Sequence, residues 1–339
     1  MGVGGWGGED GGTEGVGGVG ELVDEFEAER GRLTAAAYRM LGSRSEAEDA
    51  VQETWLRCAG ALGDPAERAK VRNLAAWLAT TCGRICLDVL RSARVRRESY
   101  PGQWLPEPLV GPYHPGPAPD GFAPDPAERA VRADRLGTAL LVVLERLSPE
   151  QRVALVLHDV FAVPFDEIAG MLGVTVVAAR QLASRARRAI TAPDAPRHTA
   201  DLAEQRRVVA AFVAATQSGE LAELVRVLAP DVVLIGDGGG HFPAARRPVT
   251  GADAVGRFTL GLFGQAGRYG GRVRARPVLV DGSLGLQFEI AHPDGRRQRL
   301  VTAFAVHDGR ITGIFNQLNP DKLTRLPDLG AGAEWPPRW

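Results

Sequence analysis

Hydrophobic positions that recur every three or four residues dominate the first 190 residues of the chain. This period is typical of amphipathic helices, and it begins near Glu21 and continues, with breaks, to about Arg97. Proline and glycine are then too dense for a helix to persist, until the helical period resumes at Ala127 and runs to Ile190. A short segment, TAPDAPRH, follows. The pattern therefore predicts two helical regions that are joined by a long linker and followed by a hinge.

The pattern changes after the hinge. Two helices, at about 201–217 and 219–228, precede an apolar run, DVVLI, which is typical of a strand that ends in a turn. Another helix is expected near 251–264, and four apolar-rich runs follow it: RVRARPVLV, LGLQFEI, QRLVTAFAVH and RITGIFNQL. Hairpin-type turns separate these four runs, so we expect an antiparallel meander in an α+β domain. The turns are Asp281-Gly282, Pro293-Asp294-Gly295 and Asp308-Gly309.

Composition limits the classes of protein that need to be considered. A chain of 339 residues has room for two or three domains, and its formal net charge of −1 hides local segregation of charge. Three cysteines form no disulfide framework, which is typical of a reducing cytosol. No apolar run approaches the roughly 18 residues of a membrane span. The Gly-rich N-terminus, which has neither a basic start nor an apolar core, predicts a flexible tail rather than a signal peptide.

The stretch TVVAARQLASRARRAI (175–190) carries four arginines and no acid. Two helices are expected before this stretch. The first starts at a capping box formed by Ser148 and Gln151, and the second, shorter one ends at Gly173. Two helices joined by such a tight turn predict a helix-turn-helix, whose second helix enters the major groove of DNA. We expect Val177, Leu182 and Ala186 (or Ala189) to face the core. The exposed stripe would carry Arg180, Ser184 and Arg188, with Gln181 and Arg185 beside it, although a solvated basic face is the alternative.

Two long motif blocks give the chain a resemblance to a known family. AYRMLGSRSEAEDAVQETWLRC and NLAAWLATTCGRICLDVLRSARVRRE resemble region 2 of bacterial sigma factors of the extracytoplasmic-function (ECF) type. LSPEQRVALVLHDVFAVPFDEIAGMLGVTVVAARQLASRARRAI resembles region 4 of the same factors. The blocks stand in the order and at the separation found in that family. The resemblance implies two all-α domains that bind core RNA polymerase and promoter DNA.

The resemblance also implies roles for residues of region 2. Asp49, Gln52 and Glu53 share one helical face by their spacing, and they would dock on the clamp helices of the largest polymerase subunit, while region 4 would meet the polymerase flap. An ordinary solvated helix face is the alternative on spacing alone. Phosphate charge explains the arginines of the next helix, and Trp77 is interpreted either as a stacking platform for an unpaired base or as a core residue. The expected contacts with the downstream promoter element are Asn73, Trp77, Arg84, Arg91 and Arg94, and those with the upstream element are Thr175, Arg180, Gln181, Ser184, Arg185 and Arg188.

The last 140 residues resemble a SnoaL-like domain of the NTF2-like superfamily, an α+β cone around a pocket. WLPEP (104–108), DGGG (237–240) and NPDKL (319–323) match motifs of the sigma-factor subgroup that is fused to such a domain. The resemblance implies that this domain contacts the linker and regulates the factor in cis, by inhibition or by support. A plain spacer in which Trp104 packs locally is the alternative. The expected regulatory contacts are Trp104, Leu105, Pro106, Glu107, Asp237, Gly238, Gly239, Asn319, Pro320, Asp321 and Lys322.

Members of the superfamily that act as cyclases or isomerases make an enzyme the main rival interpretation. Catalysis would need an Asp/His acid–base pair in an apolar cone, and the candidates by position are Asp237, His241, Asp253 and His292. A structural or interaction role is favoured over catalysis for Asp237 and His241. GDGGGH also lacks the Lys-Ser/Thr of a phosphate-binding loop, so its glycines are interpreted as a sharp turn after DVVLI. A ligand-sensing repressor is a third interpretation.

The resulting prediction is a cytoplasmic sigma factor that is not an enzyme and needs no cofactor or metal. Cys82 and Cys86 lie one helical turn apart, but no histidine or third cysteine is near them, so we interpret them as core residues. The predicted partners are core RNA polymerase and promoter DNA, with a small ligand for the C-terminal pocket left open and no membrane. The predicted division is a tail (1–20), region 2 (21–98), a linker (99–126), region 4 (127–192), the SnoaL-like domain (200–325) and a second tail (326–339).

Overall fold

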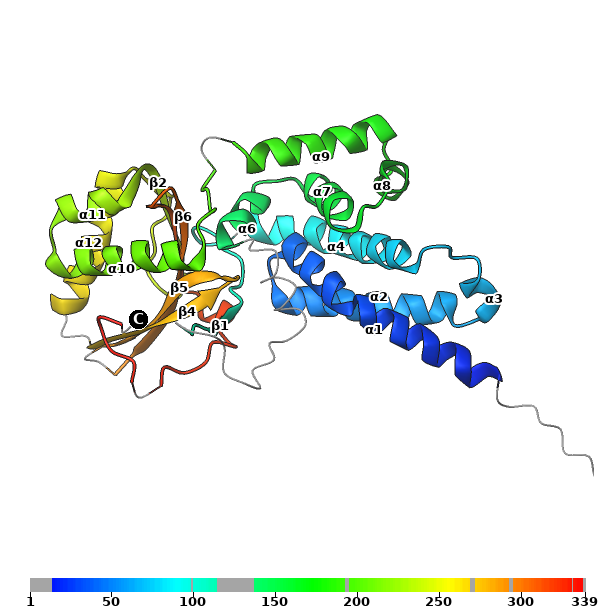
Figure 1. Ribbon diagram of the computed structural model, residues 1–339, viewed down its shortest axis with the longest axis horizontal. Helices are drawn as coiled ribbons and strands as arrows, with labels where there is room; N and C mark the ends of the chain where they lie inside the picture. The colour runs from blue at the N-terminus through cyan, green and yellow to red at the C-terminus, as the bar shows by residue number, and fades with distance from the viewer. Residues whose placement is uncertain are drawn as a thin grey trace, which may run out of the picture.

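A computed structural model describes residues 14–98, 100–114, 137–192, 195–268, 272–292, 295–330 and 332–337. Figure 1 shows a helical part at one side and a curved sheet with its own helices at the other. The two parts meet where the extended segment after α4 and the short helix α6 lie against the sheet. No helix in the described ranges combines the length and apolarity that a membrane crossing requires.

The first helical group consists of α1 (Glu14–Leu41), α2 (Arg44–Leu62), α3 (Pro65–Arg68) and α4 (Leu74–Glu98). Helix α1 begins at Glu14, within the segment predicted to be a flexible tail. It ends at Leu41 and is followed by Gly42, whose φ of +69° suits glycine, and Ser43 caps α2 through the N–H of Glu46. Helix α2 packs on the helical core through an apolar stripe, because Val51 and Leu62 are buried and Trp55 packs, half-buried, against the same core.

The second helical group consists of α6 (Gly137–Glu145), α7 (Pro149–Phe161), α8 (Phe165–Leu172) and α9 (Val176–Ile190). The capping box at Ser148 is present, and Gly173 adopts the left-handed conformation at the end of α8. These local signals were correct because caps and turns depend on only a few neighbouring residues. The predicted helical residues from Ala127 to 136 lie outside the described ranges.

The two helical groups share one hydrophobic core. Buried residues between Leu22 and Leu90 pack in the same cluster as buried residues between Leu141 and Ala186. Arg152 of α7 is only 2% exposed and reinforces this contact, because its Nη1 donates to the Met40 carbonyl at 2.7 Å and pairs with Glu145 at 2.6 Å. The helices of both groups are therefore held as one body in this conformation.

The C-terminal part carries the helices α10 (Leu202–Ser218), α11 (Leu221–Val227) and α12 (Ala252–Arg268). Its strands are β2 (Leu228–Asp237), β3 (Val249–Thr250), β4 (Arg272–Val280), β5 (Ser283–Ala291), β6 (Arg297–His307) and β7 (Arg310–Gln317). With β1 (Val110–Pro112) the strand order is β1-β4-β5-β6-β7-β2-β3, and the predicted antiparallel meander over β4 to β7 is confirmed. Strand β2 pairs with β7 in parallel, which the local pattern did not predict.

The linker contributes a strand to this sheet. Residues Val110–Pro112 form β1, which pairs antiparallel with β4 so that Val110 lies opposite Val280. The start of the linker is therefore bound rather than a plain spacer. Both faces of the sheet are covered: one cluster packs under α10 to α12, and a second joins the other face to Leu105 of the linker, Val142 of α6 and Leu323.

Candidate functional site

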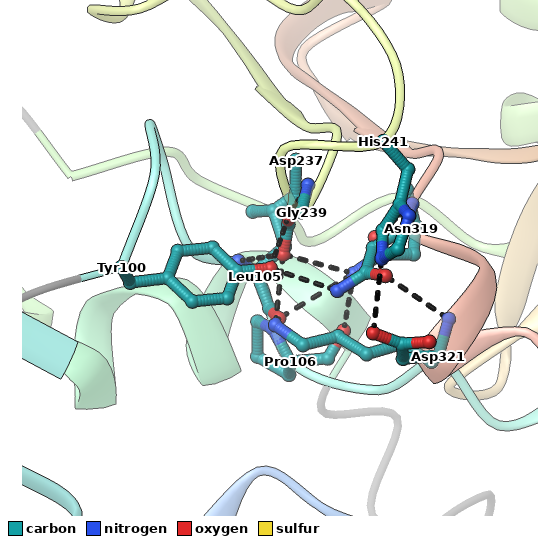
Figure 2. A network of polar contacts seen from close by, with 10 residues as sticks. Tyr100, Leu105, Pro106, Asp237, Gly239, His241, Asn319 and Asp321 are labelled. Carbon is teal, nitrogen blue, oxygen red and sulfur yellow. Dashed lines mark hydrogen bonds and ion pairs between the residues drawn. The ribbon is translucent and has the colours of Figure 1, made fainter. Parts of the chain in front are cut away.

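The linker is held at a polar centre built around Asp237, the last residue of β2 (Figure 2). This carboxylate is fully buried. It accepts hydrogen bonds from the Tyr100 hydroxyl at 2.6 Å and the Leu105 N–H at 2.9 Å, and it pairs with Lys322 Nζ at 2.8 Å. One buried carboxylate thus joins two linker residues to the C-terminal motif NPDKL.

The glycines of DGGG allow the chain to turn tightly beside this carboxylate. Gly239 has φ of +59°, and its N–H donates to Asp237 at 3.0 Å. A Cβ atom on Gly239 would lie 2.3 Å from Asn319 Cγ, and one on Gly238 would lie 2.0 Å from the Phe242 carbonyl oxygen. Side chains at these positions would therefore push apart the segments that meet here.

The NPDKL segment closes the centre from the other side. Asn319 caps the short 3₁₀ helix Pro320–Lys322 through the Asp321 N–H and donates to the Tyr100 hydroxyl at 2.9 Å. Lys322 Nζ donates to the Leu105 carbonyl at 2.7 Å and lies 4.0 Å from the centre of the Trp104 ring. The ammonium thus binds both the charge of Asp237 and an aromatic face of the linker.

The same linker residues also bind region 2. The Glu107 carboxylate accepts hydrogen bonds from Arg44 N–H at 2.8 Å and Ser43 Oγ at 3.2 Å, at the N-terminus of α2 where a negative charge is favourable. The Glu107 N–H donates to the Gly42 carbonyl at 2.8 Å. A Cβ on Gly42 would lie 2.8 Å from Trp104, so this glycine permits the close approach. WLPEP therefore lies between the helices and the C-terminal domain.

A second buried carboxylate joins four parts of the chain. Asp281, in the turn between β4 and β5, is 2% exposed. It accepts hydrogen bonds from the hydroxyls of Tyr38 of α1 at 2.9 Å and Thr138 of α6 at 2.7 Å, and from the linker N–H of Leu109 at 3.1 Å. Burial raises the pKa of Asp281 and raises the pKa of Tyr38 well above its ordinary value.

Helix α2 presents the face that was predicted to bind polymerase. Asp49 and Gln52 are exposed, and Glu53 is partly buried and pairs with Arg57 at 2.9 Å. Leu56 continues this face one turn later and is 58% exposed, which is unusual for a large apolar residue. At the edge of α2, Glu48 pairs with Arg325 at 2.9 Å, and the hydrogen bond from this guanidinium lowers the pKa of Glu48 to about 2.

Helix α9, the predicted recognition helix, is exposed on the side that the sequence indicated. Thr175 caps it through the Ala178 N–H at 3.2 Å. The prediction that Val177 faces the core is wrong, because this residue is 62% exposed. The fully buried residues of α9 are Ala179, Ala183 and Ala186, and Val176 packs on the core in the place of Val177. The predicted stripe is exposed at each of its positions: Arg180, Gln181, Ser184, Arg185 and Arg188.

The residues predicted to bind the downstream element are spread along α4. Asn73 caps the helix by accepting the Ala76 N–H at 3.0 Å. Trp77 is half-buried against the core, Arg84 is exposed, and Arg91 pairs with Glu150 of α7 at 3.2 Å. The side chain of Arg94 lies outside the described ones. The structure therefore does not gather these residues into one cluster.

An apolar cavity of about 380 Å³ lies between α12 and the sheet. Of the four acid–base candidates only His292 lines it, and this imidazole contacts Gln298 at 3.4 Å. Asp237 is bound to the linker, His241 lies 3.2 Å from the exposed Asp321, and Asp253 pairs with Arg257 at the surface. Among the described lining residues there is no carboxylate, so the Asp/His pair of the rival enzyme is not assembled here.

Three family models match the chain. "Sigma-70 region 2" matches residues 26–96, "Sigma-70, region 4" matches 138–190, and "SnoaL-like domain" matches 209–314. The ECF RNA polymerase sigma factor SigJ of Mycobacterium tuberculosis is 44% identical over 311 residues, which cover 90% of this chain and 94% of that protein. The chain belongs to the ECF family of RNA polymerase sigma factors.

A second relative and a solved structure support the same family. The probable ECF RNA polymerase sigma factor SigI of M. tuberculosis is 34% identical over 310 residues and covers 91% of this chain and 97% of the relative. The crystal structure of M. tuberculosis SigJ superposes with a TM-score of 0.70 at 41% identity, over 90% of this chain and 99% of that one. The predicted fold class, two helical sigma regions and an α+β NTF2-like domain, is thereby confirmed.

Several residues of the sigma factor's linker site were not predicted. Tyr100 and Gln317 join the Asp237 centre, where Gln317 Nε2 donates to the Pro106 carbonyl at 3.2 Å. Tyr38 and Asp281 form the second junction. Asp281 was visible only as a hairpin-turn residue, and no local signal marks Tyr38 or Gln317, because their partners are remote in sequence.

Proposed function

We propose that this sigma factor directs core RNA polymerase to specific promoters in the cytosol, and that its C-terminal domain regulates this activity in cis. The observation that carries the proposal is the combination of three features in one chain. A helix-turn-helix has a basic face without acids, α2 has an exposed face with polar and apolar residues, and a bound linker connects both to an NTF2-like domain. Run-off transcription with purified core polymerase from the promoter upstream of the factor's own gene tests it. A transcript that requires the factor is expected; its absence from this and other candidate promoters would refute the proposal.

The polymerase-binding surface is assigned to Asp49, Gln52, Glu53 and Leu56 of α2. The three polar residues offer a partly acidic surface, and the exposed Leu56 supplies the apolar contact that gives most interfaces their buried centre. The clamp helices of the largest polymerase subunit are the proposed partner, and the flap is the proposed partner of region 4. The ion pair between Glu48 and Arg325 lies next to this face, so the C-terminal segment borders the docking site.

Changing Leu56 to aspartate should weaken the binding of core polymerase by at least about tenfold, because a charge would replace an interface anchor. The affinity is measured by titrating fluorescently labelled factor with core enzyme. Leu202→Asp is the matched control, because Leu202 is 44% exposed at the start of α10 and lies far from α2 in sequence and domain. Equal affinities for the two variants would remove Leu56 from the proposed surface.

The promoter-binding surface is assigned to two helices. On α9 the proposed contacts with the upstream element are Thr175, Arg180, Gln181, Ser184, Arg185 and Arg188, since arginine and glutamine can read base edges or hold phosphates. On α4 the proposed contacts with the downstream element are Asn73, Trp77, Arg84, Arg91 and Arg94. Arg91 must leave Glu150 before it can meet a phosphate, so DNA binding there competes with the contact between regions 2 and 4.

Changing Arg188 to alanine should lower promoter affinity in the polymerase complex and, if it holds a phosphate, reduce the slope of log affinity against log salt by about 1. Arg187→Ala is the control. It removes one positive charge from the neighbouring position, but Arg187 already pairs with Asp159 at 2.5 Å and so is not expected to hold a phosphate. The measurement is a salt series of promoter binding by each holoenzyme. Identical slopes for Arg188→Ala and the wild type would exclude a phosphate contact at Arg188.

The proposed regulation acts on the contact between regions 2 and 4. In this conformation the two regions share one core, whereas two promoter elements on a DNA duplex require them to be apart. The C-terminal domain stabilises the shared core, because it binds WLPEP at Asp237 and binds both α1 and α6 at Asp281. We therefore propose that the bound linker restrains the factor and that its release permits the open arrangement.

A further inference from the structure

The cavity of the C-terminal domain has the chemistry of a binding site for a ring-containing small molecule. Its volume of about 380 Å³ lies in the range of ligand sites. Leu262 and Arg296 are exposed at its rim, so it is open to solvent. Six phenyl rings stand in its wall among aliphatic side chains, which favours flat or cyclic ligands over extended chains. The six phenyl rings are those of Phe212, Phe242, Phe258, Phe263, Phe288 and Phe304.

One polar group in this wall has no partner. Thr259 of α12 is 4% exposed, and its Oγ1 makes no hydrogen bond with the described residues. Four other polar side chains of the wall form two hydrogen-bonded pairs, Thr302 with Asn316 at 2.8 Å and His292 with Gln298 at 3.4 Å. An unpaired buried hydroxyl is costly, and a hydrogen-bonding group of a ligand would relieve that cost. The hydroxyl therefore marks where the polar end of a ligand would lie.

The chain's own C-terminal segment forms the outer layer of this wall. Trp335 stacks on Phe263 with centroids 4.9 Å apart and also lies 5.5 Å from Phe288. The segment is bound to β4, because Arg274 Nη2 donates to the Gly330 carbonyl at 2.6 Å and the Ala275 N–H donates to the Glu334 backbone carbonyl at 3.4 Å.

The other end of this segment reaches region 2. Arg325 pairs with Glu48 of α2, and the neighbouring Leu326 packs in the same cluster as Leu105 of the linker. The described residues 325–330 and 332–335 therefore contact α2 and the linker cluster at one end and the outside of the cavity wall at the other. A shift of the wall rings can reach α2 and the linker through this segment, by way of the Arg325–Glu48 ion pair and the packing of Leu326.

We propose that the cavity binds a mostly apolar, ring-containing small molecule whose hydroxyl or carbonyl pairs with Thr259, and that the C-terminal segment, through its described residues 325–330 and 332–335, reports occupancy to α2 and the linker. The lining has no carboxylate among the described residues and carries the Arg296 guanidinium, so neutral or anionic ligands are preferred over cations. This inference deepens the cis-regulatory part of the proposed function and rests on it for its meaning. It is tested without polymerase, so a failure here leaves the transcription test unaffected.

The test uses the full chain and two probes of similar shape, 1-naphthol and 1-methylnaphthalene, with affinities measured by calorimetry. The wild type should bind 1-naphthol about fivefold to tenfold more tightly, as one buried hydrogen bond implies. Thr259→Val should abolish that preference while it retains 1-methylnaphthalene. Thr216→Val is the matched control, because Thr216 is a buried helical threonine whose hydroxyl is already bonded to Val213.

Hydrogen exchange with and without 1-naphthol tests the reporting segment. Amides of residues 326–335 should change their exchange rates when the probe is bound, whereas those of α7 should not. Failure of the wild type to bind 1-naphthol, or an equal preference in Thr259→Val, would overturn the ligand assignment. Binding without any change in residues 326–335 would overturn the role of the C-terminal segment.

Discussion

Replacing Asp237 with alanine should release the linker from the C-terminal domain. The buried carboxylate serves Tyr100, Leu105 and Lys322 at once, and Lys322 is only 15% exposed at its side chain. Removing one partner of a buried ion pair typically costs about 3 to 5 kcal/mol, because the remaining charge and donors stay desolvated. The ratio of the arrangement with a bound linker to the one with a released linker should therefore fall by at least about 100-fold. Hydrogen exchange of residues 100–109 measures this release directly.

The control for this prediction is Asp321→Ala in the same cluster. Asp321 is 75% exposed at its side chain, and its carboxylate contacts His241 at 3.2 Å. A surface substitution of this kind changes the free energy of unfolding by less than about 0.5 kcal/mol. Unchanged exchange of residues 100–109 in Asp237→Ala would contradict the central role of this carboxylate. If the proposed restraint is correct, the same variant should give more run-off transcript per bound polymerase than the wild type.

The parts of the fold that were predictable are those whose determinants are local. The turns at Asp281-Gly282 and Asp308-Gly309 separate the strands of the meander, because aspartate and glycine accept positive φ. The helix-turn-helix followed from a capping box, a left-handed Gly173 and a capping threonine. Each of these signals involves residues a few positions apart, so the sequence alone was enough.

The pairings that were missed join residues that are remote along the chain. Strand β1 pairs with a partner about 170 positions later, as in Val110 and Val280, and its three residues carry no strand period of their own. The parallel pairing of β2 with β7 likewise has no turn to mark it. Local pattern cannot predict such contacts, since the free energy that selects them comes from burying both faces of the sheet.

The candidate site was predictable through its motifs and not through its geometry. WLPEP, DGGG and NPDKL were identified by resemblance, and the structure brings Leu105, Asp237 and Lys322 into contact. The orientation of α9 was harder, because Val176 and Val177 are equally apolar and only the fit of alanines against α7 decides which is buried. Assigning Val177 to the core was therefore an error of about 100° around the helix.

Replacing Asp281 with alanine should loosen the contact of the C-terminal domain with both helical regions. Thr138 and the N–H of Leu109 would lose their acceptor, whereas the Tyr38 hydroxyl keeps the Glu107 carbonyl at 2.6 Å. Two buried donors left unpaired cost about 2 to 4 kcal/mol. Faster hydrogen exchange in β1 and α6 is the expected observation. Asp308→Ala is a close control, because Asp308 has the same positive φ of 50° in a similar turn but is 88% exposed at its side chain.

The same residue predicts how the restraint depends on pH. Burial in the docked arrangement raises the pKa of Asp281 above the value that it has in the unfolded chain. The stability that Asp281 contributes to the docked arrangement is therefore complete below the unfolded pKa, and it is lost as the pH rises through the raised pKa. Raising the pH should therefore favour release of the C-terminal domain in the wild type. Asp281→Asn cannot titrate and should show a flatter dependence when exchange in β1 is followed across the pH range, after correction for intrinsic exchange rates. An equal slope in both proteins would mean that another group controls the pH response, and that Asp281 joins the domains by its hydrogen bonds alone.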